Sequence, residues 1–310
     1  MFKRPILFLS LATSALVLTN CNRNSGGKNP PSSLDMYEVS FQYDGLNRSA
    51  QVHIPENYDS SFALPVVLNF HGYGGNATTH AATTGMTATS DSFQFLLVYP
   101  QGSLLGNDPH WNNALPGPDN KSDAEDLGYT SELLRRLDSA FLIDRERIYA
   151  CGYSNGGMMS YALGCYLNNE IAAIASISGC LGDTTATCAP QHPTATLNIH
   201  GTNDGVIAYD GSSEIISAPE AVAFWAAQNN TQSTPTITTS TTTSYDIEHI
   251  RYEQGDSNVT AEHIKVLGGG HVWYPKTPKP QNPKTPFQLH YLWNQSQILK
   301  QTGLDESIKI

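Results

Sequence analysis

A pentapeptide near the middle of the chain carries the residues of a nucleophilic turn. Residues 152–156 read GYSNG, follow the apolar run Arg147–Cys151, and precede the helix-prone segment Gly157–Leu167. A serine on a strained turn between a strand and a helix needs small residues two positions before and after it, and glycines occupy both places. This setting predicts Ser154 as a nucleophile.

A serine hydroxyl becomes nucleophilic when a base takes its proton and an acid orients that base. In strand–turn–helix sites of this kind the acid follows the serine along the chain, and the histidine comes last. Asp204 directly follows the predicted strand Thr196–His200, where a carboxylate shares the rim of a parallel sheet with the nucleophile. We therefore predict Asp204 as the acid. Asp183, in a loop between cysteines, and Asp210, beyond the rim, are the alternatives.

One histidine stands at the end of a predicted strand. His271 follows the run Glu262–Leu267 and three glycines, so it lies on a loop that can bring an imidazole to the same rim. The other histidines after Asp204 lie in strand-like or helical runs: His249, His263 and His290. His271 is thus the predicted base, with a solvated loop histidine as the alternative.

Acyl transfer also needs donors that face the developing oxyanion. The backbone N–H of Asn155, next to the nucleophile, is one candidate. The glycine-rich loop HGYGG at 71–75 follows the predicted strand Leu64–Phe70 and offers the N–H of Tyr73 as the other. No cysteine and histidine spacing typical of a metal site occurs, nor a phosphate-binding glycine motif, so we predict neither metal nor cofactor.

The elements that must position these residues alternate between strand and helix. An opening hairpin (Tyr37–Tyr43 and Ala50–Ile54) precedes buried strands at Leu64–Phe70, Phe93–Tyr99, Arg147–Cys151, Ile171–Ile177 and Thr196–His200. Helices are predicted at Ser122–Leu137, Pro219–Gln228 and Phe287–Leu299, and the threonine-rich segment Thr231–Ser244 as an edge strand or solvated connection. This alternation predicts an α/β fold with a mostly parallel sheet covered by helices on both faces.

Composition and charge disfavour two kinds of binding function. The 310 residues are 39% hydrophobic and 15% charged, which is typical of a globular domain. With 17 basic and 28 acidic residues the formal net charge is −11, so binding to nucleic acid or to anionic lipid through a basic patch is disfavoured.

The first residues resemble an export signal. Lys3 and Arg4 precede the uncharged apolar run Ile6–Thr19, which is too short to span a bilayer comfortably. We predict a signal peptide at 1–20, a flexible tether at 21–35 and one catalytic domain at 36–310. Cys21 resembles the lipidated cysteine of a bacterial lipobox, so lipid anchoring at a membrane or cell surface is expected, and simple secretion is the alternative.

Export to an oxidising compartment favours disulfides among the remaining cysteines. Cys180 and Cys188 lie eight residues apart in a loop-like stretch and are predicted to pair. Cys151 and Cys165 occupy apolar runs, where a free cysteine packs as a small hydrophobic residue, and their pairing is left open.

Seven motifs in one order resemble the secreted polyhydroxybutyrate depolymerase/feruloyl esterase group of α/β-hydrolases over about residues 36–300. They are HGYGG (71–75), YPQG (99–102), WNNA (111–114), EDLGY (125–129), RIYACGYSNGGMMSY (147–161), HGTND (200–204) and GGGHVW (268–273). The resemblance implies a triad of Ser154, Asp204 and His271, an oxyanion hole at Tyr73 and Asn155, and a substrate-facing Trp111. Val206-Ile207-Ala208-Tyr209, after the acid, departs from the family's pattern in a segment that borders the substrate.

The predicted function is that of an exported serine carboxylesterase. By resemblance its substrates are feruloyl or acetyl esters of plant polysaccharide, with hydroxybutyrate oligomers as the alternative. A serine peptidase of the same fold and a non-catalytic surface-binding lipoprotein remain further alternatives. A panel of ester and amide substrates separates polysaccharide esters, hydroxybutyrate oligomers and peptides as the substrate. The absence of any turnover would identify a non-catalytic binding protein.

Overall fold

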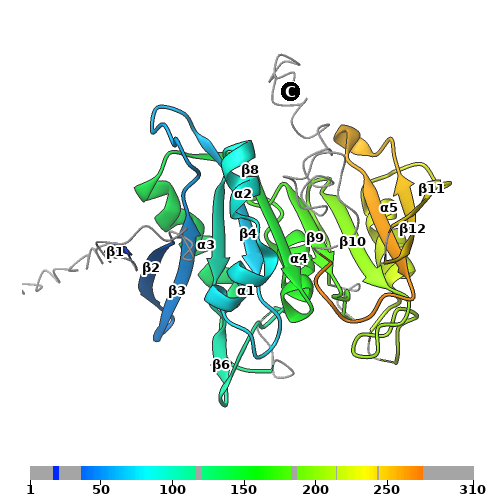
Figure 1. The fold of residues 1–310 in the computed structure, drawn as a ribbon, viewed down its shortest axis with the longest axis horizontal. Helices are drawn as coiled ribbons and strands as arrows, with labels where there is room; N and C mark the ends of the chain where they lie inside the picture. The colour runs from blue at the N-terminus through cyan, green and yellow to red at the C-terminus, as the bar shows by residue number, and fades with distance from the viewer. Residues whose placement is uncertain are drawn as a thin grey trace, which may run out of the picture.

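One large sheet runs through the molecule. The computed structural model describes residues 17–20, 36–115, 121–182, 187–213, 215–242 and 244–274. Within them the strand order is β1-β2-β3-β5-β4-β8-β9-β10-β13-β12-β11 (Figure 1). The strands are β1 (Val17–Asn20), β2 (Tyr37–Tyr43), β3 (Leu46–His53), β4 (Leu64–Phe70), β5 (Leu96–Pro100), β8 (Ile143–Tyr153), β9 (Ala173–Ile177), β10 (Ala195–Gly201), β11 (Thr236–Thr241), β12 (Asp246–Tyr252) and β13 (Ala261–Leu267).

The centre of the sheet is parallel and its edges are antiparallel. Strands β5, β4, β8, β9, β10 and β13 pair in parallel, whereas β1 to β3 and β11 to β12 pair antiparallel. All seven residues of β4 are buried, as the continuous apolar run at 64–70 predicts for a strand covered on both faces. The predicted mostly parallel α/β sheet is therefore confirmed.

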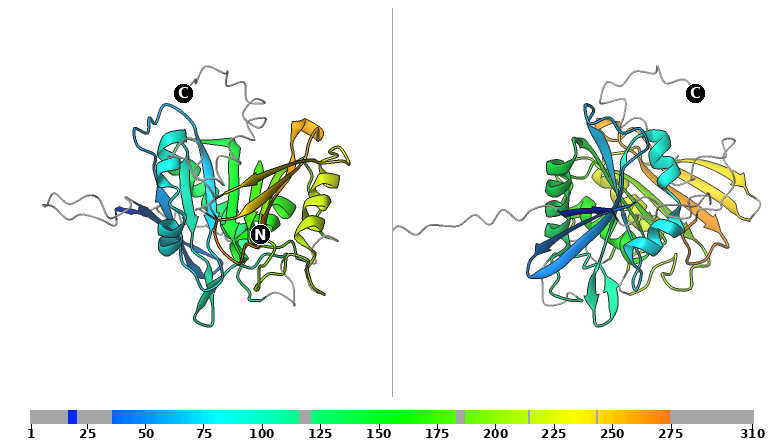
Figure 2. Two further views of the ribbon diagram at one scale, coloured as in Figure 1. Left: turned by 45° about the vertical axis from the view of Figure 1, so that its right-hand side comes forward. Right: turned by 60° about the vertical axis from the view of Figure 1, so that its left-hand side comes forward.

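Helices cover both faces of this sheet (Figure 2). Helices α1 (Ala77–Thr84) and α2 (Thr87–Phe93) lie on one face, where Ala81 and Met86 share a core with Val67 of β4. Helices α3 (Asp126–Ala140), α4 (Asn155–Tyr166) and α5 (Ala218–Gln228) lie on the other, in a second core. A short hairpin, β6 (Ser103–Leu105) and β7 (Asp108–His110), and a 3-10 turn at Asp256–Asn258 complete the described elements.

Helix α3 begins later than the sequence predicts. The side chain of Glu125 accepts the Gly128 N–H at 3.2 Å and caps the first turn. The residues before it cannot extend the helix, because the carbonyls of Ser122 and Ala124 accept hydrogen bonds from the Asn112 side chain. The predicted start at Ser122 is thus wrong by four residues.

Other differences concern short elements. The predicted strand at 93–99 starts three residues late, at 96, because α2 ends at Phe93 and Gln94 takes a left-handed φ of 54° before β5. Helices α1 and α2 and the β6–β7 hairpin were not predicted. The threonine-rich segment contains β11, an edge strand exposed at all six positions. Strand β1 falls inside the predicted signal peptide, and Cys21, the tether and the predicted helix at 287–299 lie outside the described residues. Among described residues, no helix has the length and apolarity to cross a bilayer.

Candidate active site

Ser154 stands at the sharp turn between β8 and α4. Its φ of 53° and ψ of −118° place it in a backbone conformation that costs an L-residue about 1–3 kcal/mol. A Cβ at Gly152 would collide with the carbonyl of Gly156, and a Cβ at Gly156 would collide with the carbonyl of Phe70. Glycine is therefore required on both sides of the serine, and the predicted turn is confirmed.

His271 reaches Ser154 from the loop after β13. Its Nε2 lies 3.0 Å from Ser154 Oγ, and its ring is about one-seventh exposed (14%). The loop is tied to neighbouring strands: Tyr153 donates its hydroxyl to the His271 carbonyl at 2.9 Å, and Ser178 donates to the Val272 carbonyl at 3.0 Å. These bonds hold the imidazole at hydrogen-bond distance from a residue 117 positions away.

Asp204 completes the row of three side chains. Its carboxylate is fully buried, and Oδ2 lies 2.8 Å from His271 Nδ1. Oδ1 accepts the backbone N–H groups of Val206 and Ile207, each at 2.9 Å. Since an ionised carboxylate only accepts hydrogen bonds, Nδ1 of His271 carries the proton and Nε2 is left to accept from the serine.

The competing residues that the structure describes do not enter this row. Asp210 is exposed on a turn, and Asp183 and His290 lie outside the described residues. His249 pairs with Glu262 at 2.6 Å, and His263 is buried against the hydroxyl of Tyr209. The geometry therefore brings together the three side chains that the sequence singles out.

His200 is a neighbour that sequence reasoning missed. Its Nε2 donates to the Ile207 carbonyl at 2.9 Å and lies 3.3 Å from Asp204 Oδ2. Burial lowers the pKa of His200, so the ring is neutral at pH 7 and offers a single N–H. The HGTND motif was the available signal, because its first residue faces the carboxylate four positions later.

The two predicted oxyanion donors belong to segments next to Ser154, since Asn155 follows it in the chain and the 71–75 loop packs against it. A Cβ at Gly72 would stand 3.4 Å from Ser154 Cβ, which places the 71–75 loop directly against Ser154. In that loop Gly74 donates to the Pro109 carbonyl and Gly75 to the Gly72 carbonyl. Within the described part of the chain, neither the Tyr73 N–H nor the Asn155 N–H has an acceptor. Both amides are thus free to bind an oxyanion.

Trp111 does not face the substrate. Its side chain is fully buried, and its Nε1 donates to the His71 carbonyl at 2.9 Å. The ring contacts Phe70 edge to face and stacks on Tyr129, with centroids 5.0 and 6.5 Å away. The predicted substrate-facing position is therefore wrong, because the ring fills the core behind the active site.

The predicted disulfide is also wrong. Cys188 pairs with Cys165, and Cys180 is a free, buried thiol, as is Cys151. The topology gives the reason. Because β9 and β10 are parallel, the chain between them must return from the carboxyl ends of the strands to their amino ends. Helix α4 runs in the same direction, from the carboxyl ends of the strands to their amino ends. At residue 188 the chain therefore lies beside the last turn of α4, which carries Cys165, and no longer beside Cys180.

No group of three or more histidine, cysteine, aspartate or glutamate side chains in the described ranges is arranged to hold a metal ion.

Comparison with known proteins gives a family for this arrangement. Residues 58–222 match the model of a family described as phospholipase/carboxylesterase, a group of α/β-hydrolases. A probable feruloyl esterase C from Aspergillus niger is 30% identical over 209 residues, covering 66% of this chain and 71% of the relative. Feruloyl esterase B from Piromyces equi is 30% identical over 188 residues, and the matched part spans only 34% of that protein and 59% of this chain.

Solved structures share the fold at low sequence identity. The acetyl xylan esterase from Aspergillus awamori superposes with a TM-score of 0.52 at 16% identity, covering 72% of this chain and 89% of that one. A ferulic acid esterase from Anaeromyces mucronatus superposes with a TM-score of 0.50 at 17% identity, covering 84% and 93%. At such identities the likeness concerns the fold of the sheet and its helices.

Proposed function

The chain belongs to the phospholipase/carboxylesterase family of α/β-hydrolases, and on that premise we propose that it is an exported serine carboxylic-ester hydrolase. The observation that carries the proposal is the continuous row from Ser154 Oγ through the His271 ring to Asp204, with distances of 3.0 and 2.8 Å. A hydroxyl, an imidazole and a carboxylate in this order are the parts of an acyl-transfer site.

In the first half of the reaction, Ser154 Oγ attacks the ester carbonyl carbon and its proton passes to His271 Nε2. The Asp204 carboxylate stabilises the resulting imidazolium through Nδ1. The carbonyl oxygen becomes an oxyanion, which the N–H groups of Tyr73 and Asn155 bind. When this intermediate collapses, the carbon–oxygen bond to the alcohol breaks, and His271 returns its proton to the departing oxygen.

In the second half, water replaces the alcohol. His271 takes a proton from the water as its oxygen attacks the acyl carbon of the ester on Ser154. The same two N–H groups bind the second oxyanion. Collapse releases the carboxylic acid and returns the proton to Ser154 Oγ, so that the residues end in their starting state and no cofactor is consumed.

The proposed substrates are feruloyl or acetyl esters of plant polysaccharide. Relatives named for feruloyl and acetylxylan ester hydrolysis support this choice. Exposed apolar side chains next to the site favour an acyl group with an apolar face: Tyr73 is 52% exposed, Val206 69% and Val272 42%. A feruloyl ring has such a face, whereas an acetyl group is too small to cover all three.

Substitution of the nucleophile tests the function. We expect Ser154→Ala to lower kcat on p-nitrophenyl acetate and methyl ferulate by at least about 10⁴-fold with an unchanged melting temperature. Ser160→Ala is the control, because it removes a buried hydroxyl from α4, the helix that follows Ser154, and this hydroxyl bonds to the Gly156 carbonyl and not to His271. A substrate panel with acetylated xylan, hydroxybutyrate oligomers and peptide amides then ranks the substrate classes. Full ester turnover by Ser154→Ala would refute the assignment.

We further propose that residues 1–20 direct export and that Cys21 carries a lipid anchor. The Cys165–Cys188 disulfide supports an oxidising compartment. The catalytic domain would then extend from 36 to 310, and β2 would become the edge strand of the mature sheet. Incorporation of labelled palmitate into the wild-type chain, and its loss in Cys21→Ser, is the expected result. Equal labelling of both chains would exclude the anchor.

A further inference from the structure

Trp111 forms hydrogen bonds to both sides of the proposed oxyanion hole. Its backbone N–H donates to Asn155 Oδ1 at 2.8 Å, and its carbonyl accepts from Asn155 Nδ2 at 3.1 Å. Its indole Nε1–H donates to the His71 carbonyl at 2.9 Å. One residue therefore contacts the helix start that carries one donor and the loop that carries the other.

These contacts restrain the peptides next to the donors. The Asn155 side chain belongs to the residue whose own N–H is a proposed donor. The His71 carbonyl lies one peptide before the Gly72–Tyr73 bond, which carries the second donor. His71 is fixed from its ring as well, because its Nε2 accepts the Gly102 N–H at 3.0 Å. Burial lowers the pKa of His71 to about 4, so the ring stays a neutral acceptor at pH 7.

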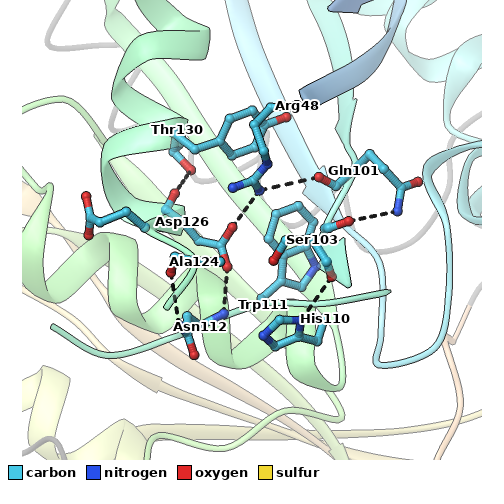
Figure 3. A network of polar contacts seen from close by, with 12 residues as sticks. Arg48, Gln101, Ser103, His110, Trp111, Asn112, Ala124, Asp126 and Thr130 are labelled. Carbon is cyan, nitrogen blue, oxygen red and sulfur yellow. Dashed lines mark hydrogen bonds and ion pairs between the residues drawn. The ribbon is translucent and has the colours of Figure 1, made fainter. Parts of the chain in front are cut away.

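Trp111 is itself held from behind by a buried ion pair (Figure 3). The next residue, Asn112, donates its backbone N–H to Asp126 Oδ2 at 2.7 Å. Asp126 Oδ1 lies 2.5 Å from Arg48, and both side chains are no more than 2% exposed. The Arg48 guanidinium lies 3.7 Å from the ring centroid of Tyr129, on which Trp111 stacks. The whole assembly is shielded from solvent.

We propose that Trp111 is a positioning residue that fixes the spacing of the two oxyanion donors. This inference rests on the proposed function, because it assigns a purpose to the oxyanion hole. Transition-state stabilisation depends on donors held in place before the reaction, and a displacement of about 1 Å costs about 10²-fold in rate. Since Trp111 is fully buried, it acts on the ester only through His71 and Asn155.

The test removes the indole N–H and keeps an aromatic ring. We expect Trp111→Phe to lower kcat on p-nitrophenyl acetate about tenfold, to leave KM within about twofold, and to weaken inhibition by phenylboronic acid about tenfold. Phenylboronic acid forms a tetrahedral adduct on the serine and so reports on the oxyanion hole. Asn155→Ala, which keeps the backbone donor but loses both bonds to Trp111, should show the same pattern and serves if Trp111→Phe does not fold.

Trp225→Phe is the matched control. Trp225 is also fully buried, but its Nε1 has no hydrogen-bond partner among the described residues, so this substitution loses ring volume alone. Wild-type kcat and boronate inhibition in Trp111→Phe, or losses no larger than in Trp225→Phe, would overturn the proposal. So would a raised KM with unchanged kcat, which marks a substrate contact. Failure of the proposed function is seen separately, as ester turnover that survives Ser154→Ala.

Discussion

The buried ion pair between Arg48 and Asp126 leads to a prediction whose size follows from the structure. Arg48 comes from β3 and Asp126 from the first turn of α3, so the pair joins the N-terminal hairpin to the helix layer. Arg48→Met keeps most of the aliphatic stem and removes the charge. Asp126 would then keep the N–H of Asn112 and lose the one ion-pair partner that it has among the described residues.

The expected loss of stability is large. Removing one partner of a buried pair leaves an uncompensated charge and typically costs about 3–5 kcal/mol. In a domain of this size about 1 kcal/mol shifts the melting temperature by about 2–4 °C, so we expect a fall of about 6–20 °C. Arg145→Met gives the comparison, because Arg145 pairs with Asp138 at the surface with a side chain 46% exposed. That substitution should cost less than about 1 kcal/mol.

The pH dependence of the loss has a defined sign. Burial raises the pKa of Asp126, and Arg48 opposes that rise. In Arg48→Met the opposing charge is gone, so the folded-state pKa of Asp126 rises further above its unfolded value. Because the folded state then binds the proton more tightly than the unfolded chain, stability is gained as pH falls through the folded-state pKa and is lost as pH rises through it. The destabilisation should therefore be smaller at pH 5 than at pH 8.

Urea unfolding at these two pH values measures the effect. The double variant Arg48→Met/Asp126→Asn removes both charges and should recover about 1–3 kcal/mol relative to Arg48→Met alone. The reasoning is refuted if Arg48→Met costs no more than Arg145→Met. It is equally refuted if the deficit grows on acidification, since the buried carboxylate would then not be its source.

Two further predictions concern the disulfide and the second histidine. Cys165→Ser should lower the free energy of unfolding by about 3 kcal/mol, because the disulfide closes a loop of 23 residues. Cys180→Ala is the control and should leave the disulfide intact. Equal stability of Cys165→Ser and wild type in urea unfolding would contradict the pairing. His200→Phe should lower kcat about tenfold and shift the acidic limb of the pH–rate profile, since it removes the N–H near Asp204 Oδ2. His200→Gln, whose amide can replace that N–H, should keep most of the wild-type activity. Identical profiles for both variants and wild type would exclude a positioning role for His200.

The sequence predicts which three side chains come together, because the constraints on them are local. The elbow at 152–156 is recognisable because the crowding around Ser154 is created by its own neighbours in the chain. Asp204 and His271 could be chosen because each follows a buried strand, and the carboxyl ends of parallel strands meet at one edge. These inferences need only the order of strands along the chain.

The errors share a different cause. The partner of Cys188 depends on how far the chain travels between two parallel strands, and the spacing of cysteines along the chain does not contain that distance. The burial of Trp111 depends on contacts with His71 and Asn155, which are 40 and 44 positions away. His200 contacts Asp204 only because of the turn that follows β10. The errors at Cys188 and Trp111 thus concern contacts that the tertiary structure alone defines, whereas the His200–Asp204 contact spans four residues and was open to sequence reasoning.

Close backbone contacts at the carboxyl ends of the central strands determine where the proposed catalytic groups stand. Gly156 allows α4 to approach the Phe70 carbonyl, and Gly201 allows the loop that carries His271 to approach the end of β10. A side chain at either place would displace the element that carries the nucleophile or the base, while every reacting residue remained present. Gly156 directly follows Asn155, whose side chain bonds to Trp111, so a displacement of α4 would disturb the turn and the proposed oxyanion hole together. The positions of the glycines therefore determine the geometry of the site as much as the three side chains proposed to react.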